Sequence, residues 1–179
     1  IQGHEHLVYF STTQIGYQLW AIPMGIFYVN EQLPMILHHG TVVVVTCMSA
    51  LLTNGFRYWT PFFYGLVEIS SVPLAILNAF KDNPELIKSY PDIYMAVRWT
   101  FAVTFLYVRL VLFVPRHLRY ISDHFLLYWT SSNPLYFCFM LGVSLSSVTL
   151  LILQIYWSSL IVRGIVARKK TIRNGAKQN

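Results

Sequence analysis

The sequence predicts an all-α fold, a multi-pass bundle of transmembrane helices. Of its 179 residues, 55% are hydrophobic and only 11% are charged, and the mean hydropathy is +0.50. A soluble domain of ordinary composition carries about 25% charged residues, so this chain is too apolar to be one. Several apolar runs reach the roughly 20 residues that a helix needs to cross the hydrocarbon core.

One domain accounts for the chain. No repeat and no Gly/Ser or Pro linker divides it, so we expect one transmembrane bundle over residues 1–163 and a basic tail over residues 164–179. The sequence begins at Ile1 without a methionine or a charged segment before an apolar core. We therefore expect that further residues precede it.

The first of five expected spans covers residues 7–29. Its polar side chains Gln14, Tyr17 and Gln18 follow i, i+3 and i+4 spacing, so they are expected to share one helical face. Polar groups facing hydrocarbon are costly, so this face should form hydrogen bonds inside the bundle. Gln14 and Tyr17 are accordingly candidates for the lining of an internal cavity.

The second span, residues 34–54, begins with Pro34, which suits the first turn of a helix. The adjacent histidines His38 and His39 follow within its first turns. Neutral imidazoles there can serve as packing and hydrogen-bonding groups, or one of them can act as a general base for an alcohol or amine nucleophile. The residues leave both interpretations open.

The third span, residues 58–80, holds one carboxylate, Glu68, near its middle. A charge at that depth costs roughly 2.5–3.5 kcal/mol on insertion scales, so Glu68 should face protein or water and have a partner. Helical spacing places Ser71 and Asn78 close to it on a narrow polar face. Pro73 should kink the helix just beyond the glutamate. Glu68 is either a buried structural group or a ligand-binding or catalytic carboxylate.

The fourth span is expected over residues 93–115, after a short polar connection that contains both charge signs and two prolines. It carries Arg109 within vertical reach of Glu68, so an ion pair between these two side chains is expected. Residues 116–134 are mixed and aromatic, and we expect them to lie along the membrane interface.

The fifth span, residues 135–162, contains no charged residue and is longer than the hydrocarbon core requires, so it should be tilted. Lysine and arginine outweigh acidic residues in the tail, which is expected on the cytoplasmic or an equivalent side. Contact with anionic headgroups is the ordinary explanation of such a tail, so no nucleic-acid partner is expected.

No metal and no cofactor are expected. His4 and His6 should lie roughly 30 Å from the adjacent histidines of the second span, across the hydrocarbon core, so the two pairs cannot share a metal. With no other histidine inside the expected spans, facing axial ligands for a haem are also missing. The two cysteines give no disulfide framework.

Several short motifs follow one another along most of the chain. They are Gly16-Tyr17, the pair His38-His39, the run from Glu68 to Asn78, the segment from Phe105 to Arg109-Leu-Val, and the ending Gln154-Ile-Tyr-Trp157. As an ordered set they resemble the TLC (TRAM, Lag, CLN) homology family of multi-pass membrane proteins, particularly its small TLC-domain-containing subgroup. The resemblance implies a helical bundle around a lipid-accessible cavity, commonly in the endoplasmic reticulum; a mitochondrial or plastid inner membrane is the alternative.

The resemblance also limits the function. Family members include ceramide synthases, which N-acylate sphingoid bases with acyl-CoA, and non-catalytic proteins linked to lipid composition, protein translocation or cargo export. In the ceramide synthase branch, acidic residues accompany the histidine pair; here the segment from Val67 to Ser71 stands where that branch has His-Asp-x-x-Asp. Lipid binding or membrane-lipid homeostasis without catalysis is therefore the leading expectation.

Two alternatives stay open. An N-acyltransferase would take acyl-CoA as substrate and use His38 or His39 as a base, with Glu68 as an orienting group. An accessory subunit of a larger complex would bind other membrane subunits through its aromatic-rich spans. For the leading function, the residues expected to bind lipid are Gln14, Tyr17, His39, Glu68, Ser71, Asn78 and Arg109.

Overall fold

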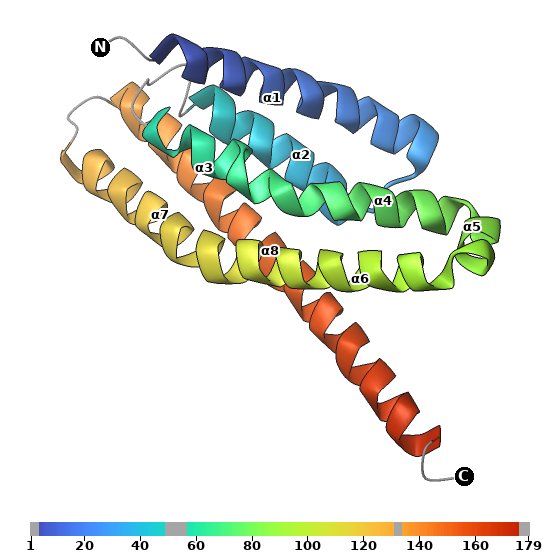
Figure 1. Ribbon diagram of the computed structural model, residues 1–179. Coiled ribbons are helices and arrows are strands. Elements are labelled where there is room, and N and C mark those ends of the chain that lie inside the picture. Colours follow the sequence, from blue (N-terminus) through green and yellow to red (C-terminus); the bar gives the residue numbers. More distant parts are fainter. Residues whose placement is uncertain (1–3, 49–56, 131–133, 176–179) are drawn as a thin grey trace.

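Every described element of the computed structural model is helical, which confirms the all-α class (Figure 1). The structure describes residues 4–48, 57–130 and 134–175. Rods of helix run back and forth, each antiparallel to the one before it (Figure 1). In chain order they are α1 (His4–Met24) with the π-helical turn η1 (Gly25–Val29), α2 (Leu33–Thr46), α3 (Thr60–Tyr64) with α4 (Ser71–Asp82), α6 (Pro91–Leu106) with α7 (Phe113–Thr130), and α8 (Pro134–Gly175).

Shorter helices join or interrupt these rods. The 3-10 helix η3 (Arg57–Trp59) precedes α3, and the 3-10 helix η4 (Leu66–Ser70) separates α3 from α4. Between α4 and α6, the short helix α5 (Pro84–Ser89) forms the expected polar connection. The π-helical η5 (Tyr107–Leu112) connects α6 to α7 without a break.

Three helices in the described part of the chain are long and apolar enough to cross a membrane: Thr60–Asp82, Pro91–Leu126 and Phe137–Ala167. They overlap the third, fourth and fifth expected spans. The apolar helix α2 is shorter, and the second expected span continues into residues 49–54, outside the described residues. Five crossings of the membrane therefore stay a prediction.

The bundle carries apolar side chains outside and many polar ones inside. Large apolar residues that are more than half exposed include Leu19, Ile69, Val103, Leu145 and Ile152. Polar residues at most 2% exposed include Gln18, His117, His124, Ser147 and Gln154. Side chains facing hydrocarbon must be apolar, whereas polar groups in a membrane bundle face its interior. This distribution fits an integral membrane protein.

The third rod departs from the α-helix over η4, Leu66–Ser70, so the irregular turn begins before Glu68 and extends just beyond it. Pro73 has no amide proton for the Ile69 carbonyl, and the chain before it forms the tighter turn η4. Gly65 precedes this turn, and a Cβ there would lie only 2.5 Å from the Pro61 carbonyl oxygen. The change of direction thus requires a glycine.

The expectation that residues 116–134 form a separate interfacial segment was wrong, because α6, η5 and α7 are one rod. Pro115 follows η5, and the wider π turn leaves room for a ring that an ordinary α-helix would not accommodate. The helix therefore continues, and it carries His117 and His124 into the bundle, where no further histidine was expected.

Two apolar clusters form the core. The larger one joins α2, α7 and α8 through Val42, Val45, Tyr120, Met140, Val143 and Leu150. The smaller one joins η4, η5 and α7 through Val67, Val108 and Phe113. Helix α8 crosses the other rods obliquely, and its C-terminal part extends beyond them (Figure 1). The site described next lies between these clusters and α1.

Candidate functional site

A pocket opens between the helices and encloses about 600 Å³, the space at its mouth included. Side chains from α1, α2, α3, η4, η5, α7 and α8 line it. Most of its wall is aliphatic or aromatic, as at Val42, Phe63 and Leu150. The charged, imidazole and amide groups on the wall are Gln14, His38, Glu68, Arg109, His117 and Gln154, and Thr60, Tyr64 and Tyr120 add hydroxyl groups.

Glu68 and Arg109 form the charged part of this wall. Arg109 Nη2 lies 3.7 Å from Glu68 Oε1, which confirms the ion pair expected from the sequence. Arg109 Nε also donates a 3.1 Å hydrogen bond to Ser70 Oγ. The second carboxylate oxygen of Glu68 accepts a 2.6 Å hydrogen bond from Ser71. Arg109 is 6% exposed, so its charge depends on Glu68 for compensation.

Both charged residues stand on backbone that departs from the α-helix. Glu68 lies on the 3-10 helix η4, and Arg109 lies on the π-helical η5. Each irregular turn shifts the direction of the side chains that follow it, because the number of residues per turn changes. The ion pair therefore forms where two rods deviate from regular geometry at the same level.

His39 forms a second polar cluster, which lies outside the pocket. Its Nδ1 is hydrogen-bonded to Gln18 Oε1 on α1, and its Nε2 lies 3.4 Å from Glu31 Oε2. Both ring nitrogens of His39 therefore face oxygen atoms of neighbouring elements. This Glu31–His39–Gln18 cluster ties α1, α2 and the connection between them together.

The connection between η1 and α2 positions Glu31. Asn30 adopts left-handed backbone geometry, with a φ of 53°, a conformation that asparagine tolerates better than most residues. The amide of Glu31 then donates a 2.9 Å hydrogen bond to the Gly25 carbonyl. A Cβ on Gly25 would lie 2.7 Å from Glu31 Oε2, so the missing side chain makes room for the carboxylate.

His38 differs from its neighbour, because it lines the pocket. Its ring lies 5.6 Å from that of His39 and 5.5 Å from that of Trp157, measured between centroids. His38 Nδ1 is buried and has no hydrogen-bond partner among the described residues. One of the two expected histidines is thus engaged in structure, and the other has a nitrogen available.

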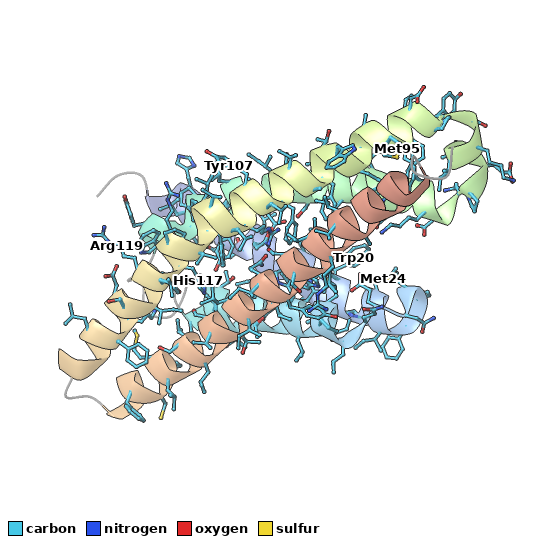
Figure 2. The ribbon with its side chains drawn as sticks, turned by 90° about the horizontal axis from the view of Figure 1, so that it is seen from below. Trp20, Met24, Met95, Tyr107, His117 and Arg119 are labelled. Carbon is cyan, nitrogen blue, oxygen red and sulfur yellow. The ribbon has the colours of Figure 1, made fainter. Side chains whose placement is uncertain are left out.

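His117 was not expected from the sequence. It is 2% exposed on α7, stacks on Phe113 at 4.5 Å between ring centroids, and forms part of the pocket wall. Its Nε2 donates a 2.8 Å hydrogen bond to the Ser147 carbonyl of α8. Figure 2 shows His117 on the side of α7 that faces α8, whereas Tyr107 of the same rod points away.

Of the other residues expected at the site, some lie at the pocket and some are exposed on the outside of the bundle. Gln14 lines the pocket, and Ser71 lies behind Glu68 through the hydrogen bond already described. Tyr17 is 54% exposed, and Asn78 is also exposed on α4; neither lines the pocket. Gln154, which the sequence indicated only within a motif, is 1% exposed on the pocket wall.

Metal binding has no support in the described part of the chain. No three side chains among its histidines, cysteines, aspartates and glutamates are grouped so that they could hold an ion. The polar groups of the pocket are instead imidazole, amide and hydroxyl groups and one ion pair. They can orient a ligand by hydrogen bonds.

A comparison with protein-family models matches the TLC domain over residues 2–163. The match covers the whole pocket and most of α8. Neither the curated proteins nor the solved structures give a match.

Proposed function

We propose that this chain, which belongs to the TLC-domain family, binds a membrane lipid in the pocket between its helices. The observation that carries the proposal is the composition of the wall, which is aliphatic and aromatic with a few convergent polar groups. Sites of that kind suit a ligand with a long apolar part and a small polar one. The apolar outer surface of the bundle would give such a ligand direct access from the membrane.

The contacts of two candidate catalytic groups support binding without turnover. Glu68 is occupied by Arg109 and Ser71, and both ring nitrogens of His39 face partners. A general base needs a lone pair within reach of the substrate proton. Membrane-lipid homeostasis through binding is therefore favoured over catalysis.

His38 supports a second candidate function, N-acylation with acyl-CoA. Its buried Nδ1 has no partner among the described residues and its ring lines the pocket. In that reaction His38 would accept the proton of an amine as the amine attacks the thioester carbonyl, and the thiolate of coenzyme A would leave. Incubation of purified protein with acyl-CoA and a sphingoid base tests this function, and His38→Ala should abolish any product.

The chain is an integral membrane protein, and its finer placement is proposed. We place it in the endoplasmic reticulum, with a mitochondrial or plastid inner membrane as the alternative, and its basic tail on the cytoplasmic side of five crossings. Microscopy of a tagged full chain tests the organelle. Protease treatment of sealed vesicles tests the tail, which should be digested without detergent.

Lipid binding is tested by filling the pocket. Leu150 is 7% exposed on the pocket wall, and Ile152 of the same helix is 59% exposed. Leu150→Trp should reduce the lipid that co-purifies in mild detergent, measured by mass spectrometry per mole of protein. Ile152→Trp adds the same bulk outside and should leave the bound lipid unchanged.

Three results would count against the proposal. Equal lipid content in the unmodified protein and in folded Leu150→Trp would place the lipid elsewhere. Turnover of acyl-CoA would favour the second candidate function. Stable co-purification of other membrane chains, with His38 and the pocket dispensable, would favour an accessory subunit.

A further inference from the structure

The hydrogen bonds of His117 determine which of its ring nitrogens is available. The Ser147 carbonyl oxygen can only accept, so His117 Nε2 must carry the proton of the 2.8 Å hydrogen bond between them. In a neutral imidazole the other nitrogen, Nδ1, is then a bare acceptor. The ring is 2% exposed and packs against Phe63, Phe113 and Tyr120, an environment that favours the neutral form.

This acceptor has no donor. His117 Nδ1 is buried and makes no hydrogen bond to any described residue, although the ring belongs to the pocket wall. A second acceptor on the same wall, Gln154 Oε1, is also buried and unpaired, and so is His38 Nδ1. An unpaired buried acceptor costs about 1–3 kcal/mol, so His117 Nδ1 and Gln154 Oε1 on one wall favour an occupant that supplies a donor.

We infer that the lipid bound in this pocket carries a hydroxyl group that donates a hydrogen bond to His117 Nδ1. The inference rests on the proposed function and deepens it by naming the headgroup. A phosphate headgroup would place its oxygen atoms, which accept hydrogen bonds, against the acceptors of the pocket wall. A protonated amine would add a cation near Arg109, and Glu68, the carboxylate on this wall, is already paired. A neutral alcohol satisfies the wall without adding charge.

The test compares two ligands of the same chain, one with a hydroxyl donor and one in which a methyl group replaces the hydroxyl proton. Radiolabelled oleyl alcohol is bound to the purified full chain in detergent, and unlabelled oleyl alcohol or oleyl methyl ether is used to displace it. Both ligands have the same chain, but the ether has no hydroxyl proton. The ether should displace the label about tenfold less well, the loss expected for one buried hydrogen bond.

Two substitutions locate the effect. His117→Phe keeps an aromatic ring in the stack but removes Nδ1, so the two ligands should then displace the label equally. His117→Asn places an amide oxygen near the position of Nδ1 and should restore part of the preference. His124→Phe is the matched control. His124 is also buried on α7, about two helical turns beyond His117, but it does not line the pocket.

The outcomes separate this inference from the proposed function. Equal displacement by alcohol and ether in the unmodified protein would overturn the hydroxyl and leave lipid binding intact. Binding of neither ligand, together with lipid-free purified protein, would overturn the proposed function itself. Should His117→Phe not fold, as judged by elution profile and thermal midpoint, the comparison of the two ligands on the unmodified protein decides.

Discussion

Two sets of polar side chains are buried in this bundle, and they differ in whether their hydrogen-bonding groups are used. Glu68 is paired with Arg109 of the neighbouring rod, and His39 contacts Gln18 of α1 and Glu31 of the connection before α2. His38, His117 and Gln154 each leave a buried polar atom unpaired on the pocket wall. The difference teaches that charge alone does not mark a binding site in a membrane bundle. The paired groups fasten helices, whereas the unpaired groups of His38, His117 and Gln154 lie on the wall of the pocket, where a ligand can reach them.

The largest expected effect comes from breaking the ion pair. Glu68→Met leaves the guanidinium of Arg109 buried without its counter-charge, which costs about 3–5 kcal/mol when one partner of a buried pair is removed. The free energy of unfolding in mixed micelles measures the loss. The double variant Glu68→Met with Arg109→Met should recover much of it. A double variant no more stable than Glu68→Met would show that the pair does not fasten η4 to η5.

The adjacent histidines provide the sharpest form of the comparison. His39→Phe removes the contacts to Gln18 and Glu31, so it should lower the free energy of unfolding by about 2 kcal/mol while bound lipid is retained. His38→Phe removes an acceptor that has no partner and should cost less stability but reduce bound lipid. If both variants change stability and lipid content alike, the division between paired and unpaired groups is wrong.

A smaller effect is expected at Gly25. An alanine Cβ there would meet Glu31 Oε2 at 2.7 Å and Ile36 Cδ1 at 2.9 Å, both far ends of side chains that can move. Gly25→Ala should therefore displace the carboxylate from His39 and cost about 1 kcal/mol, the lower end for overpacking. In a double-mutant cycle, Gly25→Ala should add little to His39→Phe. Full additivity of the two changes would contradict a shared role.

The smallest effects are expected at the two outward-facing candidates. Tyr17 and Asn78 are exposed and do not line the pocket, so Tyr17→Phe and Asn78→Leu should change the free energy of unfolding by less than about 0.5 kcal/mol. Bound lipid should also be unchanged. A clear loss of lipid in either variant would mean that the ligand contacts the outer surface.

The sequence allowed the ion pair to be predicted because a lone carboxylate at bilayer depth needs a counter-charge, and Arg109 was the cation at a matching depth. It did not allow the faces of the third span to be predicted. Spacing of 3.6 residues per turn was assumed from Glu68 to Asn78, but η4 is a 3-10 helix with about three residues per turn, so the two residues diverge.

His117 and Glu31 could not be found from the sequence for different reasons. Pro115 and the arginines after it read as the end of a span, and the π turn that accommodates the proline has no reliable sequence signal. Glu31 depends on the left-handed turn at Asn30 and on the space beside Gly25. The sequence feature that could have pointed to His117 is its position in an amphipathic segment that continues an apolar helix.

Because η5 is π-helical, the direction in which the later side chains of the fourth rod point depends on the number of residues in that turn. Deleting one residue between Tyr107 and Leu112 would let the turn close as an ordinary α-helix and would rotate everything after it by about 100° relative to α6. Arg109 and His117 could then no longer face the same interior. The extra residue in this turn therefore determines that Arg109 and His117 lie on the same wall of the pocket.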